Sequence, residues 1–503
     1  MTARARTEPL DRLDATLGSR SGLRLRLVCP SQEFSAKEMS FGIGRWLSSS
    51  RGLWESLRVA AEPDLAVVML QAPAVGADVE DFLLGIVPSD PATAADRRAR
   101  HALVEIDDDG DRHLSEKVLD DPGLLRRLAR TVTLARRAGH VVEGLACFAS
   151  SPRMTALAHA LGTDLLETDA RLLGWGHKSG GRQLFRASGV PHLPGSYVPD
   201  HDVPSLAARL AGLVRVHGSG RWVVKVDHGF GSGHGNAFVT VGSDRQYDVE
   251  QELRTSLRPM GAGVCRTEFL SWVAEVGAVV ERHAGDVIGH PSALAHLSRT
   301  AGVEFLGVHD QLVGAAGDFL GCRYPARPEY RDAVEREALK VFTALATRGA
   351  SGHVGVDFLV ARSPARLYTT EVNLRQTGST HPHRTVRTVL PLDLRTPGRL
   401  ATRDGRAVCF HATDSVLSPT CRGVSTASLI AALRASPRLY LDRTAGRGVV
   451  PHLWPALGRF GKLGVTAIGR SAAECEQLVT EFGELLHDLG QSTARSSRRP
   501  SSP

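Results

Sequence analysis

The chain has 503 residues, 42% of them hydrophobic and 23% charged, with a formal net charge of +7. Its length exceeds what one hydrophobic core accommodates and predicts about three domains. The composition is that of an ordinary soluble globular protein, and no apolar run is long enough to cross a membrane. Nucleic acid is not an expected partner, because much of the positive charge lies at the chain ends and no alternation of basic and aromatic residues accompanies it.

The seven cysteines are scattered and include no CxxC pair, so neither a disulfide framework nor a structural zinc site is expected. The first twenty residues, MTARARTEPLDRLDATLGSR, lack the apolar core of a signal peptide and are predicted to be disordered. These features favour the cytoplasm, and no membrane partner is expected.

Residues 21–172 contain short apolar runs, among them LRLRLV and LAVVML, that alternate with segments of helical periodicity. This alternation is typical of an α/β domain with a parallel sheet. The dinucleotide fingerprint is absent, because Gly42 and Gly44 in SFGIGRW lack both a third glycine and a preceding strand. A dinucleotide cofactor is therefore not expected in this domain.

Two lysines lie beside glycines in the next part of the chain. Lys178, in GWGHKSGGRQLFRASG, precedes a predicted helix whose N-terminus favours an anion, although a simple loop lysine explains the same pattern. The run RWVVKVDHGFGSGHGNAFVTV predicts a strand that carries Lys225, a glycine-rich loop over 228–236 and a return strand. Backbone N–H groups of such a loop can enclose phosphates, while a flexible hairpin tip is the alternative.

Two further charged residues follow apolar runs. Glu281 ends the predicted strand Val276–Val280 and is placed to lie beside a base ring, with an exposed strand end as the alternative. Arg323 lies among glycine and apolar residues, where it is a candidate anion ligand or one partner of a structural salt bridge.

The stretch HVGVDFLVARSPARLYTTEVNLRQTGSTHPH, residues 353–383, predicts a β-hairpin. Its strands are Val354–Val360 and Leu367–Asn373, and Ser363 and Pro364 form the turn between them.

This hairpin predicts a cation site. In a regular hairpin Asp357 and Glu371 face each other, and Asn373 lies two places further along on the same face. Opposed carboxylates repel unless a cation lies between them, and carboxylate and amide oxygens are the ligands that Mg²⁺ uses beside nucleotide phosphates. The alternative is an imperfect hairpin with both acids in solvent.

Residues 396–490 again mix strands and helices and predict a small α+β domain, and 491–503 predict a disordered tail. Only Cys409 is followed closely by both a histidine and an acid, His411 and Asp414. Because these residues lie in an apolar strand, packing is the preferred interpretation and covalent catalysis is not expected.

The order of these elements resembles that of ATP-grasp ligases from about Gly176 to Leu394. The blocks GHKSGGRQLFRASGVPHLPG, HDQLVGAAGDFLGCRYPA and EVNLRQTGSTHPH are similar to blocks of pheganomycin-type peptide ligases, which join a carboxylate to a peptide or amino-acid amine. The resemblance implies a Rossmann-like pre-ATP-grasp domain at 21–172, an ATP-grasp domain at 173–395 and a small C-terminal domain at 396–490.

The same resemblance implies a role for each residue. Lys178 and Lys225 would contact the α and β phosphates of ATP, and Glu281 would lie at the adenine hinge. The loop residues Gly229, Gly231, Ser232, Gly233 and Gly235 would close over the β and γ phosphates. Asp357, Glu371 and Asn373 would hold Mg²⁺, with Mn²⁺ as the alternative ion.

Arg375 would lie beside the γ-phosphate or the acyl phosphate. Some ATP-grasp ligases carry an arginine two places before the first metal carboxylate, where this chain has Gly355. The oxyanion role would then fall to Arg375, Arg323 or Arg182.

The implied reaction is amide formation through an acyl phosphate, with release of ADP and phosphate, in peptide natural-product biosynthesis. The partners would be a carboxylate and an amine, and ATP-grasp units often pair as homodimers. Two alternatives stay open, namely a phosphotransferase and a nucleotide-binding scaffold without chemistry.

Overall fold

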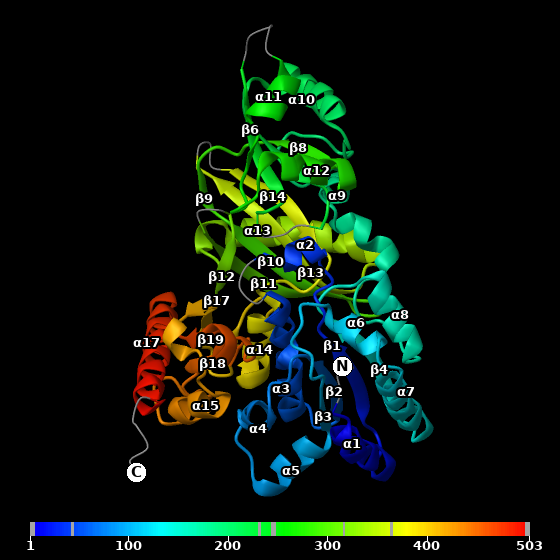
Figure 1. Ribbon diagram of the computed structural model, residues 1–503, viewed down its shortest axis with the longest axis vertical. Helices are drawn as coiled ribbons and strands as arrows, with labels where there is room; N and C mark the ends of the chain where they lie inside the picture. The colour runs from blue at the N-terminus through cyan, green and yellow to red at the C-terminus, as the bar shows by residue number, and fades with distance from the viewer. Residues whose placement is uncertain are drawn as a thin grey trace. The chain divides into compact units, whose positions relative to one another are not determined.

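The computed structural model describes residues 6–41, 45–229, 233–242, 248–314, 317–362 and 366–497 (Figure 1). The chain forms two compact units. Unit 1 comprises residues 1–33, 39–170 and 378–503, and unit 2 comprises residues 34–38 and 171–377. The first and the last predicted domains thus belong to one unit.

A parallel sheet forms the first part of unit 1, as the alternating pattern predicts. Its strands are β1 (Arg24–Cys29), β2 (Leu65–Gln71), β3 (His101–Glu105) and β4 (Val141–Cys147), in the order β3-β2-β1-β4. Strand β2, LAVVMLQ, is buried at every position, as expected of a strand with both faces covered. The helices of this part are α1 (Glu8–Ser19), η1 (Arg45–Leu53), α3 (Trp54–Ala61), α4 (Ala77–Gly85), α5 (Pro91–Ala99), α6 (Leu114–Leu119), α7 (Pro122–Arg137) and α8 (Pro152–Ala160). Helix α2 (Ala36–Met39) lies between β1 and η1 in the sequence, but all of it except Met39 belongs to unit 2.

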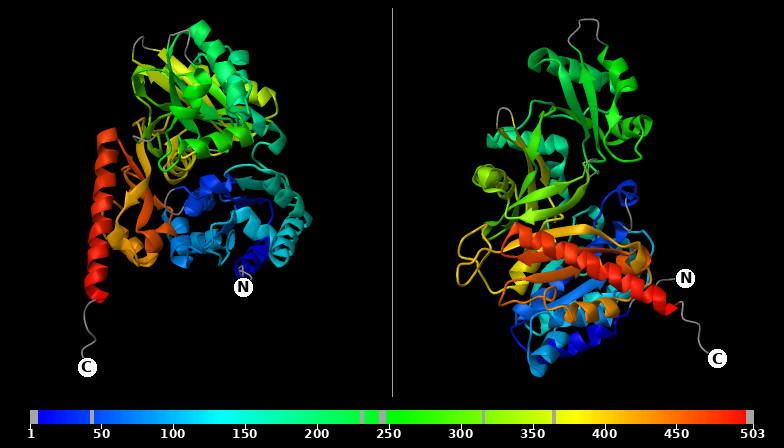
Figure 2. Two further views of the ribbon diagram at one scale, coloured as in Figure 1. Left: turned by 45° about the horizontal axis from the view of Figure 1, so that its top comes forward. Right: turned by 90° about the vertical axis from the view of Figure 1, so that its left-hand side faces the viewer.

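A small antiparallel sheet forms the second part of unit 1. Its strands β17 (Cys409–Leu417), β18 (Gly448–His452) and β19 (Lys462–Gly469) run in the order β17-β19-β18. Helix α17 (Ala472–Ser497) runs alongside β17 and β19, as both views of Figure 2 show. The remaining elements are β15 (Leu392–Asp393), β16 (Ala401–Thr402), α14 (Thr380–Val389), η3 (Pro419–Cys421), α15 (Thr426–Arg434) and α16 (Ala456–Phe460).

Both predictions of disorder at the chain ends are partly wrong. Helix α1 occupies Glu8–Ser19, and its leucines Leu10, Leu13 and Leu17 are fully buried in the core of the parallel sheet. Their spacing of three and four residues forms one apolar stripe, which outweighs the charged neighbours. Helix α17 likewise continues to Ser497, because a helix already anchored by buried residues extends at little cost.

Unit 2 contains two antiparallel sheets. The first has the strands β5 (Gly220–Val226), β6 (Asn236–Val241), β7 (Arg258–Pro259) and β8 (Ala278–Arg282), in the order β7-β6-β5-β8. In the second, β9 (Val287–Gly289), β10 (Pro291–Ser298), β11 (Gly302–Val313), β12 (Phe319–Tyr324), β13 (Gly352–Ala361) and β14 (Arg366–Asn373) follow the order β14-β13-β10-β11-β12, with β9 on β13. The helices are α9 (Lys178–Ser188), α10 (Val203–His217), α11 (Val249–Thr255), α12 (Arg266–Val276) and α13 (Pro328–Thr347), with the short η2 (Ala170–Gly176) before them.

Helix α13 covers one face of the second sheet. Its stripe Val334, Ala338, Val341, Phe342 and Leu345 is fully buried against residues of β10, β11 and β13. The opposite face of that sheet carries Asp357, Ser292 and His309. Among the described residues no helix is long and apolar enough to cross a lipid bilayer.

Unit 1 contains two buried histidines, and we expect them to make its folded state less stable in acid. His452 lies with Nε2 2.7 Å from Oδ1 of Asp414, whose carboxylate also pairs with Arg51. The ring of His381 meets that of His452 edge to face, with centroids 4.4 Å apart. Burial lowers the pKa of both histidines, that of His452 to about 3.

A histidine whose pKa is lowered by folding binds its proton only in the unfolded chain, so the stability that it contributes is lost as the pH falls below 6.5. We expect unit 1 to lose about 2 kcal/mol at pH 5 relative to pH 7 through His452 alone. Urea unfolding at both pH values measures this. The pH effect should shrink by about that amount in His452→Gln, and an unchanged pH effect would contradict the assignment.

Candidate active site

The predicted hairpin of β13 and β14 forms with the expected register. Asp357 lies opposite Glu371, and Gly355 lies opposite Asn373. The Asn373 side-chain amide donates to Oδ2 of Asp357 at 2.9 Å, so both acids and the amide lie on one face. The expected turn residues Ser363 and Pro364 lie outside the described residues.

The pKa values of the two opposed carboxylates are shifted in opposite directions. Burial and the negative charge of Glu371 raise the pKa of Asp357 to about 6. Burial alone would raise the pKa of Glu371 too, but the nearby charges of Lys178 and Arg375 lower it below the ordinary value. Lys178 Nζ lies 2.5 Å from Oε1 of Glu371. An added positive charge beside Asp357 would favour its ionised form.

This set of donors fits a divalent cation. Two carboxylates and an amide oxygen are the hard oxygen ligands that Mg²⁺ prefers. A cation held by Asp357 would offset the repulsion from Glu371 that contributes to its raised pKa.

Helix α9 begins at Lys178 and is capped from outside the helix. The preceding residue, His177, makes no side-chain capping bond. Instead, Asp227 at the end of β5 accepts the Lys178 backbone N–H on its carbonyl at 2.8 Å and that of Ser179 on Oδ1 at 2.7 Å. Asp227 thereby holds Lys178 beside the end of the strand that carries Lys225. It was not singled out from the sequence, where its only signal is an acid two places after the strand lysine.

Glu281 of β8 and Lys225 of the neighbouring strand β5 form an ion pair. Glu281 is 2% exposed and accepts from Lys225 Nζ at 3.1 Å and from Arg182 Nη1 at 2.8 Å. The other guanidinium nitrogens of Arg182 donate to the carbonyls of Ser196 and Leu193, at 2.7 and 2.8 Å. The expectation that Arg182 is available as an oxyanion ligand is therefore wrong, since its donors are used inside the fold.

Arg182 should instead matter for stability. Replacing it with methionine leaves the Glu281 carboxylate buried with one partner fewer, and we expect a loss of about 3–5 kcal/mol. Urea unfolding of Arg182→Met measures this. Arg186→Met, on the same helix and over the ring of Tyr197, is the control and should cost far less. Equal stability of the two variants would contradict this assignment.

The glycine-rich loop joins the antiparallel strands β5 and β6. Gly229 and Gly233 have φ values of 86° and 79°, which only glycine adopts readily, and the Gly235 carbonyl accepts from Val226 N at 2.8 Å. Gly231 and Ser232 lie outside the described residues.

The two remaining candidates for the oxyanion role, Arg323 and Arg375, lie in different places relative to the carboxylate pair. In the second sheet Asp357 lies opposite Ser292, and Ser292 lies opposite His309, so these side chains share one face. Arg323 lies opposite Asp310, the next residue of β11, and therefore belongs to the other face.

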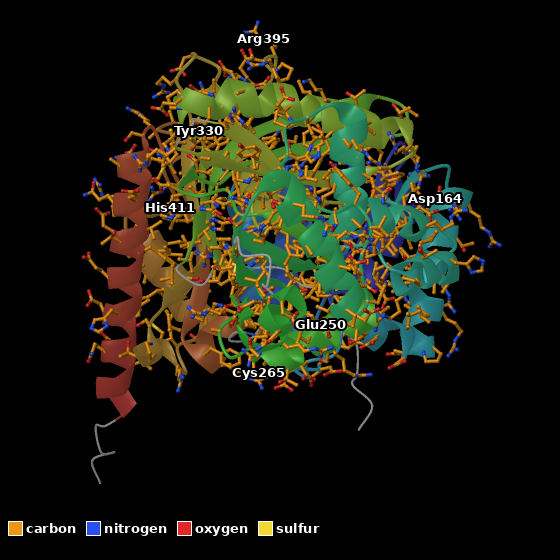
Figure 3. All side chains as sticks on the ribbon, turned by 90° about the horizontal axis from the view of Figure 1, so that it is seen from above. Asp164, Glu250, Cys265, Tyr330, Arg395 and His411 are labelled. Carbon is orange, nitrogen blue, oxygen red and sulfur yellow. The ribbon has the colours of Figure 1, made fainter. Side chains whose placement is uncertain are left out.

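Tyr330 of α13 marks the face that carries Arg323. Its hydroxyl donates to Asp310, and its position is labelled in Figure 3. The register thus does not bring Arg323 to the carboxylate pair. Arg375 lies two residues after Asn373, the last residue of β14, and its positive charge favours the ionised forms of both Asp357 and Glu371.

Solved structures share this architecture. Biotin carboxylase from Campylobacter jejuni, in a complex with β-γ-ATP, matches with a TM-score of 0.54 at 12% identity, over 93% of this chain and 95% of that one. The N5-carboxyaminoimidazole ribonucleotide synthetase from Thermus thermophilus has a TM-score of 0.50 at 16% identity, over 92% of this chain and 98% of its own. The biotin carboxylase domain of Hydrogenobacter thermophilus 2-oxoglutarate carboxylase, solved with MgADP, has a TM-score of 0.50 at 15% identity, over 90% and 87% of the two chains.

The chain belongs to the ATP-grasp carboxylate–amine ligases, which are enzymes that bind ATP and form carbon–nitrogen bonds. The relative that shows this is the L-propargylglycine–L-glutamate ligase of Streptantibioticus cattleyicolor. It is 31% identical over 428 residues, which are 82% of this chain and 83% of that protein. No family profile matches the chain.

Proposed function

We propose that the protein joins the carboxylate of an amino acid to the amine of a second amino acid or peptide through an acyl phosphate, with release of ADP and phosphate. The observation that carries this proposal is the pair Asp357 and Glu371, held face to face beside Lys178 and Asn373. Two facing carboxylates can hold a divalent cation that also binds the phosphates of ATP.

The first step is attack of the substrate carboxylate on the γ-phosphorus of ATP. Lys178 and Lys225 would offset the charge of the phosphates, the glycine loop would enclose them through its N–H groups, and Glu281 would border the adenine. Mg²⁺ or Mn²⁺, held by Asp357, Glu371 and Asn373, would supply charge neutralisation at the transferring phosphoryl group.

In the second step the amine attacks the acyl carbon and phosphate leaves. We assign the stabilisation of the tetrahedral oxyanion to Arg375, because it lies beside the carboxylate pair, whereas Arg323 belongs to the other face of the sheet. No enzyme nucleophile is needed. Burial raises the pKa of Cys409, which keeps that thiol protonated and unreactive.

The substrates are proposed from the relative's name, which specifies L-propargylglycine and L-glutamate. We place this chain in the same reaction class, with a small L-amino acid as the acid and an amino acid such as L-glutamate as the amine. A cytoplasmic role in peptide natural-product biosynthesis and a homodimeric assembly complete the proposal.

The test incubates the protein with Mg-ATP, L-propargylglycine and L-glutamate, and then with panels of the twenty common amino acids in each role. ADP, AMP, phosphate and product mass are followed. We expect ADP, phosphate and a dipeptide only when acid and amine are both present. Release of AMP, a stable phosphorylated product without an amine, or no dependence on any acid would each contradict the proposal.

A further inference from the structure

One short segment lies far in sequence from the rest of unit 2. Residues Phe34–Glu38 belong to unit 2, whereas the residues on both sides of them belong to unit 1. The nearest other part of unit 2 in the sequence begins at Arg171. The segment lies against two of the predicted site residues, Gly229 and Arg375.

Ser35 contacts the glycine-rich loop. Its hydroxyl donates to the Gly229 carbonyl at 3.1 Å and accepts the backbone N–H of Glu38, also at 3.1 Å. Lys37 anchors the segment to α12, with Nζ 2.5 Å from Oε1 of Glu268. The Ser35 hydroxyl thus donates its only proton to Gly229, the first glycine of the glycine-rich loop.

Phe34 contacts the arginine that follows the metal-site strand. The guanidinium carbon of Arg375 lies 5.2 Å from the centroid of the Phe34 ring, within the range of a cation–π interaction. The same guanidinium also makes a long hydrogen bond, from Nη1 to the Gln376 carbonyl at 3.4 Å. An aromatic face fixes the plane of a guanidinium and leaves its N–H edge free to bind an oxyanion.

We propose that Phe34–Glu38 is part of the active site, with Phe34 as a positioning residue for Arg375 and Ser35 as a positioning residue for the glycine loop. The proposal rests on the function proposed above. The main support is that this one segment contacts two groups with proposed roles. Ser35 contacts Gly229 of the loop assigned to the phosphates, and Phe34 contacts Arg375, which is assigned to the oxyanion. Loss of the Phe34 ring should then affect the reaction of the acyl phosphate more than the binding of ATP.

The test compares Phe34→Leu with Phe34→Tyr and with a matched control, Phe460→Leu. Phe460 in unit 1 also lies under an arginine, with the Arg459 guanidinium carbon 5.3 Å from its ring centroid. Each variant is assayed with the acid–amine pair that the wild-type protein uses. The readouts are kcat for amide formation, KM for ATP and the ratio of amide formed to phosphate released.

We expect Phe34→Leu to lower kcat about tenfold, because an oxyanion donor that is no longer held in place stabilises the transition state less. The ratio of amide to phosphate should fall as water intercepts the acyl phosphate, and KM for ATP should stay within about twofold. Phe34→Tyr keeps the aromatic face and should restore wild-type values. Ser35→Ala should instead raise KM for ATP, about threefold, through the lost bond to Gly229.

Identical kinetics of Phe34→Leu and Phe460→Leu, with an active wild-type protein, would overturn this inference and leave the proposed function intact. A fall in kcat that Phe34→Tyr does not restore would also overturn it, since it would show a loss of packing alone. A wild-type protein that forms no amide from any pair would contradict the proposed function itself.

Discussion

Replacing Glu371 with glutamine should lower amide formation about a thousandfold, because the change removes one of the two carboxylates that face each other and costs about 4 kcal/mol of transition-state stabilisation. It also removes the charge that Lys178 Nζ contacts at 2.5 Å. Product formation at saturating ATP measures the rate. Titration of the protein with Mn²⁺ provides a second readout and should show a weakened site.

Glu337→Gln is the matched control. Glu337 lies in unit 2 and also pairs with a lysine, Lys340 at 2.8 Å, but on the helix α13. This variant should retain wild-type activity and wild-type Mn²⁺ binding, since a pair between neighbouring turns of a helix contributes little. Comparable activity of Glu371→Gln and Glu337→Gln would exclude the carboxylate pair from the chemistry.

Replacing Arg375 with alanine should lower kcat about a hundredfold, since one donor to a tetrahedral oxyanion contributes about 3 kcal/mol. The affinity for ATP should change far less, because the lysines and the glycine loop are assigned to the phosphates. Steady-state kinetics gives kcat, and fluorescence titration with an ATP analogue gives the affinity.

Arg362→Ala serves as its control, because Arg362 follows the other strand of the same hairpin and pairs with the exposed Asp286. This control should leave both kcat and ATP affinity unchanged. If Arg375→Ala weakened ATP binding as much as it lowered kcat, Arg375 would be a nucleotide ligand and the division of roles proposed here would be wrong.

The facing of Asp357 and Glu371 was predictable because it is local. Two strands joined by a short turn fix their own register, so the spacing on each side of the turn determines which residues are neighbours. The alternation of apolar runs with helical segments predicted the parallel sheet of unit 1 for a similar reason. The chain ends were predicted less well, because their charged residues obscured the leucine stripe of α1.

Contacts between distant segments were decided by the tertiary structure alone. The sequence could not distinguish Arg182 and Arg323 from Arg375 as candidates for the oxyanion role. In the structure Arg182 is buried against Glu281, and Arg323 belongs to the face of the sheet that α13 covers. The capping of α9 by Asp227 depends in the same way on where the end of β5 lies.

By itself, then, the sequence determined the fold class, the hairpin that places Asp357 opposite Glu371 and the set of charged residues from which the ATP site is proposed, because periodicity and turn spacing act over a few residues. The tertiary structure decided which arginine adjoins the carboxylates, which residue caps Lys178 and that Phe34 belongs to unit 2. Packing brings these groups together across many tens of residues, and no local pattern encodes such contacts.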